Sequence, residues 1–200
     1  MTLLELPTER PRERSIPVLE TERLILRAPT LEDAKTIAKL ANDRRIAENT
    51  ARIPHPYSIA DAKDYVAWAK ETRAETAFLI TTLDDDVVVG ACGVSHAEGE
   101  NPEIGYWIGV RYWGQGFATE AAHAVIDYAF ERFDFDTLHS SARVTNPASR
   151  RVLEKCGCQW TGAGLGRVRA LGSSVPIDRF RLDRSVWASL KSWGKAKQMA

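Results

Sequence analysis

Residues 103–120, which read EIGYWIGVRYWGQGFATE, form the strongest candidate for chemistry in this sequence. A strand-like run from Ile104 to Val110 leads into a short loop that holds Gly114 and Gly116, and a helix is predicted to begin near Ala118. A glycine loop that opens into a helix N-terminus presents unpaired backbone N–H groups and the positive end of the helix dipole, which together bind anions, most often phosphate. The loop lacks both the Lys-Ser/Thr ending of a nucleoside-triphosphate P-loop and the third glycine of a dinucleotide motif. The sequence therefore predicts a phosphate site of another class, with a tight turn that binds nothing as the alternative.

The segment from Arg111 to Gly116, with the pattern R-x-x-G-x-G, resembles the acetyl-coenzyme A pyrophosphate loop of the GNAT N-acetyltransferase superfamily. The run YWGQGFATEA is similar to that of the RimJ/RimL-type branch, named for ribosomal-protein N-terminal acetyltransferases. Further matches between residues 20 and 188 are LETERLILR, PHPYS and FRLDRSVW. The resemblance implies that acetyl-CoA binds as a co-substrate, with the backbone of residues 108–110 facing the oxyanion. The implied cofactor-binding residues are Ile108, Gly109, Val110, Arg111, Trp113, Gly114, Gln115, Gly116, Phe117, Ala118, Thr119, Asn146 and Ser149.

A second motif, NPASRRVLEKCG, begins at Asn146 and resembles the family segment N-x-x-S-x-x-V-L-E-K-x-G-F. In the family, the Asn and Ser side chains meet the pantetheine arm and its thiol end. Many GNAT enzymes place a tyrosine four residues after the serine to protonate the leaving thiolate, but Leu153 stands there in this chain. The resemblance therefore makes Ser149 the best matched catalytic acid. The alternative is that Asn146 is only a helix cap and Ser149 only a first-turn residue.

Glu103 precedes the glycine loop by one strand, where related enzymes carry a glutamate that deprotonates the amine, often through water. A carboxyl group with an ordinary pKa of ~4.3 is a weak base for an ammonium group unless water or desolvation assists it. His96 is the competing base because an ordinary histidine pKa of ~6.5 suits neutral pH. Solvent itself is a third acceptor of the proton. His123 and His139 are interpreted as structural residues.

Apolar periodicity and capping residues predict the order strand, two helices, three strands, helix, strand, helix and two strands. Capping boxes at Thr30–Asp33 and Ser58–Asp61 begin the first two helices, and Asn146-Pro147 begins the last helix of that order. That order is the order of the GNAT fold. The resemblance thus implies a single α/β (α+β) domain with a mixed, largely antiparallel central sheet, flanked by helices and splayed at the acetyl-CoA cleft.

Three parts of the chain are expected: a loose leader at residues 1–18, the GNAT domain at 19–188 and a C-terminal tail at 189–200. The segment Gly162–Gly166 is interpreted as a flexible loop, since Arg167 stands where a dinucleotide motif needs its third glycine. We expect residues 41–58 and 162–172 to form the two sides of the amine site. The polar and aromatic residues proposed for these sides are Arg44, Arg45, Glu48, Asn49, Tyr57, Arg167 and Arg169, with Trp113 as a further aromatic wall.

Composition gives no support to a nucleic-acid partner, because Lys+Arg and Asp+Glu each total 27. No apolar run approaches the ~20 residues of a membrane span. The three cysteines lack metal-ligand companions at usable spacing, so we expect no metal, and reduced thiols in a cytoplasmic protein that is a monomer or homodimer. The resemblance implies an acetyl-CoA-dependent N-acetyltransferase whose acceptor is a primary amine, either a peptide N-terminus or a small molecule. The alternatives are a non-catalytic acyl-CoA-binding sensor and a protein-interaction module.

Overall fold

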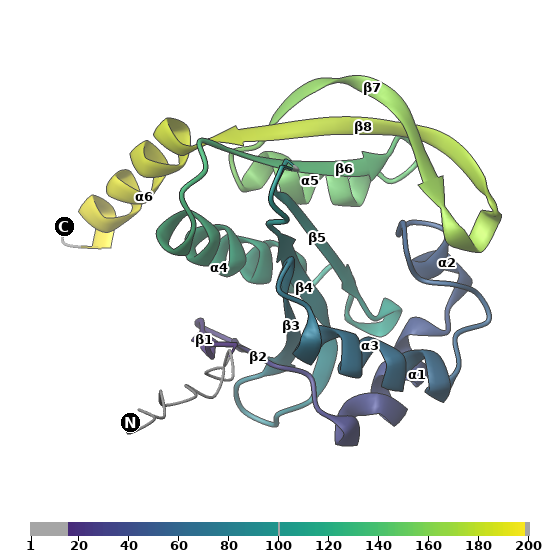
Figure 1. Cartoon of the computed structure of the whole chain (residues 1–200). Coiled ribbons are helices and arrows are strands. Elements are labelled where there is room, and N and C mark those ends of the chain that lie inside the picture. Colours follow the sequence, from purple (N-terminus) through teal and green to yellow (C-terminus); the bar gives the residue numbers. More distant parts are fainter. Residues whose placement is uncertain (1–15, 100, 199–200) are drawn as a thin grey trace, which may run out of the picture.

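The computed structural model describes residues 16–99 and 101–198, which form one mixed sheet with helices on both faces (Figure 1). The predicted leader falls mostly on residues 1–15, which lie outside the described residues. The elements in chain order are β1 (Leu19–Glu20), β2 (Leu24–Arg27), η1 (Leu31–Asp33), α1 (Ala34–Ala41), α2 (Arg44–Ala47), α3 (Ile59–Glu71), β3 (Glu75–Thr82), β4 (Val88–Ser95), β5 (Glu103–Ile108), η2 (Val110–Tyr112), α4 (Phe117–Arg132), β6 (Thr137–Arg143), α5 (Pro147–Lys155), β7 (Gln159–Val168), η3 (Arg169–Leu171), β8 (Ser173–Asp183) and α6 (Arg184–Gln198).

The sheet has the strand order β1-β2-β3-β4-β5-β6-β8-β7, and every neighbouring pair is antiparallel except β5 and β6. Helices α1 and α3 pack on one face, where Ile37 and Val66 join Leu79 of β3. Helix α4 packs on the other face, where Val125 and Phe130 join the larger core. The predicted mixed, largely antiparallel sheet flanked by helices is confirmed.

Local signals set the helix starts correctly. The Ser58 Oγ atom accepts a hydrogen bond from the Asp61 N–H at 3.2 Å, and the Asp61 carboxylate accepts from the Ser58 N–H at 2.8 Å. Asn146 Oδ1 accepts from the Ser149 N–H at 3.1 Å at the start of α5. These bonds satisfy backbone donors that a helix N-terminus leaves unpaired.

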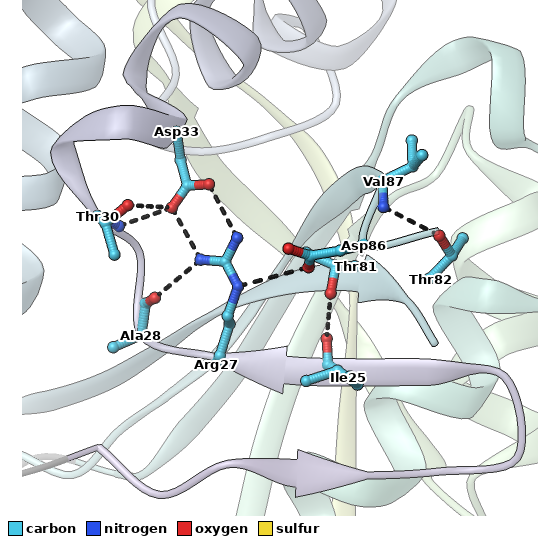
Figure 2. A network of polar contacts seen from close by, with 9 residues as sticks. All are labelled: Ile25, Arg27, Ala28, Thr30, Asp33, Thr81, Thr82, Asp86 and Val87. Atoms are coloured by element: carbon cyan, nitrogen blue, oxygen red, sulfur yellow. Dashed lines mark hydrogen bonds and ion pairs between the residues drawn. The ribbon is translucent and has the colours of Figure 1, made fainter. Parts of the chain in front are cut away.

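The first capping box is part of a larger polar network that joins β2 to the turn between β3 and β4 (Figure 2). The Arg27 guanidinium donates two hydrogen bonds to Asp33, at 2.8 and 2.9 Å, and lies 3.7 Å from Asp86. Asp33 also accepts from the Thr30 N–H at 2.7 Å. A surface hollow of about 580 Å³ lies beside this network. Since Arg27 and Asp33 already satisfy each other, we assign the network to holding the sheet and η1 together.

Three sequence expectations are wrong in detail. The segment Gly162–Gly166 is not a flexible loop but the middle of β7, which pairs with β8 along its length. Residues 41–58 are not purely a loop, because α2 forms within them, and the strand predicted to reach Val110 ends at Ile108.

Candidate active site

The predicted phosphate loop has the backbone that anion binding requires. Gly114 and Gly116 both adopt a left-handed conformation, with φ of 76° and 86°, which residues with a side chain rarely accept. Gly116 is the N-cap of α4 and no side chain caps this helix. The N–H groups of Phe117 and Ala118 therefore lack intrahelical acceptors and sit at the positive end of a 16-residue helix. This arrangement fits a pyrophosphate group.

Hydrogen bonds from Thr21 and Arg23, between β1 and β2, hold this loop in place, and we call this set of bonds the brace. The sequence pattern did not predict it. The Glu120 carboxylate on α4 accepts hydrogen bonds from Thr21 Oγ1 at 2.7 Å, from the Arg23 N–H at 2.8 Å, and from Arg23 Nε and Nη2 at 2.8 and 2.6 Å. Arg23 Nη1 donates to the Gln115 carbonyl at 3.0 Å, inside the loop. Burial opposes ionisation of Glu120, but the bonds from Thr21 and Arg23 outweigh it and lower the pKa of this carboxyl. The LETERLILR motif contained Thr21 and Arg23, but no local pattern linked them to Glu120, which is 99 and 97 positions away.

The parallel strands β5 and β6 separate along their length. Within the described residues these strands are in register only at Glu103 and His139, and Figure 1 shows them diverging from there. The Gly109 N–H donates to the Val89 carbonyl of β4 at 2.8 Å, so this donor is engaged. Because N–H groups alternate in direction along a strand, the Ile108 N–H points to the β6 side. Ile108 is thus the member of the predicted 108–110 set that best fits an oxyanion donor.

Ser149 and Asn146 lie together at the start of α5, opposite β5. The Tyr106 hydroxyl of β5 lies 2.9 Å from Ser149 Oγ and donates to the Ser149 carbonyl at 3.1 Å. Burial raises the pKa of the Tyr106 phenol, against a smaller opposite effect of its bond with Ser149, so the phenol keeps its proton at neutral pH. Leu153, where many relatives carry tyrosine, is fully buried. No sequence signal singled out Tyr106, because its partner is 43 residues away.

Glu103 stands at the point where β5 and β6 part. Its Oε1 atom accepts a hydrogen bond from Ser141 Oγ at 3.1 Å, and its side chain is exposed. A hollow of about 410 Å³ lies here, with Glu103, His139, Ser141, Thr161 and Arg179 among its lining residues. A carboxylate at the edge of a polar hollow can hold an ammonium group and receive its proton.

The competing base and the cysteines fit catalysis less well. His96 stacks on Phe133 with ring centroids 4.2 Å apart, and its Nε2 lies 3.3 Å from Thr76 Oγ1. His96 is also absent from the lining of the hollow that holds Glu103. All three cysteines are buried and unpaired, and burial raises the pKa of Cys156 to about 12 and that of Cys158 to about 11. Thiols with such pKa values are poor nucleophiles near neutral pH.

The two segments expected to flank the amine site meet each other. The Arg169 N–H of the second segment donates to the Ala51 carbonyl of the first at 2.9 Å, and Arg143 Nη1, at the end of β6, donates to the Glu48 carbonyl of the first at 2.8 Å. Tyr57, however, is not an aromatic wall of a pocket: it is 8% exposed and belongs to the core between α1 and α3. Burial raises the pKa of Tyr57 to about 12.

Two side chains named for these flanks have other surroundings. Side chains alternate between the two faces of β7. Arg167 lies on the same face as Ala163, opposite the face on which the glycines lie. Trp113 is half exposed, and its Nε1 donates to the Ile108 carbonyl at 2.6 Å. Trp113 therefore helps to fix the end of β5.

The described part of the chain contains neither a metal-binding group nor a membrane-spanning helix. No group of three or more His, Cys, Asp and Glu residues in it could hold a metal ion. No helix among residues 16–99 and 101–198 is long and apolar enough to cross a membrane.

Comparison with known proteins gives consistent matches. Residues 23–159 match the family profile described as an acetyltransferase (GNAT) domain. The uncharacterized N-acetyltransferase p20 of Bacillus licheniformis is 29% identical over 175 residues, which cover 85% of this chain and 98% of that protein. The fold is similar to that of RimL, a ribosomal L7/L12 alpha-N-protein acetyltransferase solved with coenzyme A, with a TM-score of 0.72, 17% identity, and coverage of 84% of this chain and 98% of RimL. It is also similar to spermidine N-acetyltransferase from Vibrio cholerae solved with CoA and spermine, with a TM-score of 0.71, 21% identity, and coverage of 84% and 99%.

Proposed function

This chain belongs to the GNAT acetyltransferase family and is an acetyl-CoA-dependent acyltransferase, and we propose that it transfers the acetyl group to the amine of a peptide N-terminus by direct attack in a ternary complex. One observation carries the proposal: β5 and β6 part along β5, with the hollow that contains Glu103 on the side where β5 begins and the loop that leads to the uncapped N-terminus of α4 on the side where β5 ends. Two substrates entering from these two sides would meet in the gap. No covalent acyl-enzyme is needed, since the cysteines are buried.

Each step of the reaction has a candidate group in this arrangement. Glu103 accepts the proton of the ammonium group, directly or through water, and leaves a neutral amine. The Ile108 N–H, directed into the gap, donates to the oxyanion that forms when the amine attacks the thioester carbonyl. Ser149 donates its hydroxyl proton toward the departing sulfur and regains a proton from solvent, and the Tyr106 hydroxyl at 2.9 Å orients the Ser149 hydroxyl.

The cofactor-binding role extends to the predicted loop and the start of α5. The backbone of residues 114–118 would hold the pyrophosphate, with Arg111 and Gln115 at the loop surface. Asn146 Oδ1 is occupied by the helix cap, so Nδ2 is the atom of Asn146 that would donate to the pantetheine arm.

The acceptor is proposed to be a peptide rather than a small amine. RimL is named for a protein acceptor and the Vibrio cholerae enzyme for the polyamine spermidine. The fold alone therefore leaves both classes of acceptor open. The face of β6 and β8 next to Glu103 is made of half-buried and exposed residues with none fully buried, and Ser141 and Arg179 on it are exposed. An open surface of this kind suits an extended chain better than a closed pocket does.

The test is release of CoA from acetyl-CoA in the presence of N-terminal peptides, spermidine and small aromatic amines. Peptide acetylation at the α-amine, identified by mass spectrometry, is the expected result. Glu103→Gln should lower kcat about 100-fold or more, the usual contribution of a general base, while acetyl-CoA binding is retained. His96→Gln is the matched variant and should change kcat by less than about threefold.

Two outcomes would contradict the proposal. Acetyl-CoA binding without turnover of any amine would leave an acyl-CoA sensor as the function. Loss of activity in His96→Gln but not in Glu103→Gln would transfer the role of base to the histidine.

A further inference from the structure

The glycine-rich part of β7 forms a side-chain-free surface beside the hollow that contains Glu103. Gly162 and Gly164 are in register with Arg179 and Ile177 of β8, so the glycines and these two side chains share one face of the sheet. A Cβ atom on Gly164 would lie 2.9 Å from both Nε and Nη2 of Arg179. Since Cβ atoms essentially never make contacts under 3.0 Å, the Arg179 side chain can lie across β7 only because position 164 is glycine.

Arg179 carries a positive charge that the rest of the described structure does not neutralise. No carboxylate among residues 16–99 and 101–198 forms an ion pair with it, although its side chain is exposed and lines the hollow. The neighbouring Arg181 pairs with Asp183 at 3.0 Å. Asp178, next in sequence, lies on the opposite face, where it accepts from Trp160 at 2.9 Å. The nearby acids are therefore used elsewhere.

The positions of Glu103 and Arg179 define a spacing along a bound acceptor. Arg179 is in register with Ser141 of β6, whose hydroxyl group bonds Glu103 at 3.1 Å. The Arg179 guanidinium lies over β7, two strands beyond β6, and neighbouring strands are about 4.8 Å apart. Gly164 also lies two residues, about 6.6 Å, along β7 from the register position of Arg179, so the two charged groups are roughly 12 Å apart, a distance that an extended peptide covers in three to four residues.

We propose that Arg179 is a specificity-determining residue that binds a carboxylate in the second or third residue of the acceptor peptide. This inference rests on the proposed function, because it assumes that the amine to be acetylated lies at Glu103. A guanidinium group binds a carboxylate through two parallel hydrogen bonds, which makes it selective for acids over amides. The preferred substrate class is a peptide N-terminus followed closely by Asp or Glu.

The experiment compares kcat/KM for peptides that differ only by Glu, Gln or Lys at position 2, 3 or 6. Wild-type protein should prefer Glu over Gln about five- to tenfold at position 2 or 3, as expected for a hydrogen-bonded charge pair in a partly exposed site, and show no preference at position 6. Arg179→Gln should abolish this ratio, and Arg179→Glu should favour Lys. Gly164→Ala should reduce the ratio although Arg179 is still present, because the added methyl group displaces its side chain.

Arg181→Gln is the matched control, since Arg181 lies on the same face but is paired with Asp183. It should leave the Glu/Gln ratio within about twofold of the wild-type value. Equal kcat/KM for Glu and Gln peptides in the wild type, or a ratio that survives Arg179→Gln, overturns the inference while the proposed function stands. Failure to acetylate any peptide overturns both.

Discussion

Gly116→Ala is expected to weaken acetyl-CoA binding far more than it weakens the fold. Gly116 has φ of 86°, and a left-handed conformation costs a residue with a Cβ atom about 1–2 kcal/mol. The new methyl group would also lie 3.3 Å from Arg23 Nη2, a close contact with the end of a flexible side chain. In the free protein the loop can relieve this strain by leaving the left-handed conformation.

Binding must then restore the conformation that aims the helix N-terminus at the phosphates. If binding must supply the full ~1–2 kcal/mol of strain again, the Kd for acetyl-CoA rises about 5- to 30-fold. The melting temperature should fall by about 2–4 °C for each kcal/mol that the folded state retains as strain. With bound acetyl-CoA saturating, kcat should stay near the wild-type value, because Gly116 is not among the groups proposed to move protons.

Gly99→Ala is the matched control for this prediction. Gly99 also has a left-handed φ, of 79°, and a Cβ atom there would meet nothing within 4 Å. It should lower the melting temperature by a similar amount and leave the Kd within about twofold of wild type, as measured by calorimetric titration with acetyl-CoA. A Gly116→Ala protein that melts like the control and also binds acetyl-CoA normally would refute the assignment of this loop.

Three further predictions follow from side-chain hydrogen bonds. Arg23→Ala, which removes the brace between Glu120 and the loop, should raise the acetyl-CoA KM about five- to tenfold with little change in kcat, whereas an unchanged KM would show the brace to be dispensable. Tyr106→Phe should lower kcat about tenfold and leave acetyl-CoA affinity unaltered because the phenol orients the Ser149 hydroxyl, and a normal kcat would exclude that role. Asp33→Asn should cost about 1.5–3 kcal/mol of stability above about pH 5. Burial alone would raise the pKa of Asp33, but its hydrogen bonds with Arg27 and Thr30 lower this pKa by more. The stability difference between the wild type and Asp33→Asn should therefore shrink as the pH falls below ~3.9, the pKa of an unfolded aspartate. A difference that stays constant down to about pH 2 would contradict this.

Local sequence was sufficient for features that depend on a few consecutive residues. The capping box at Ser58, the N-cap at Asn146 and the loop glycines were predictable because a cap or a left-handed turn depends on the residue type at that position. Apolar periodicity and capping residues also predicted the order of the elements, and the family resemblance added the parting of β5 from β6. The loop proposed to bind the cofactor could thus be located from the sequence alone.

Contacts across the fold decided the rest. The glycines of β7 suggest a loop because glycine weakens a strand in isolation, yet here glycine admits the Arg179 side chain from β8. Tyr57 lies in a segment expected to face a substrate, but α1 and α3 enclose it. The pairs Arg23–Glu120 and Tyr106–Ser149 each join segments whose separation along the chain leaves no periodic trace. A sequence pattern records the preferences of neighbouring residues, whereas the partner of a buried or bridging side chain is fixed only when the strands and helices pack together.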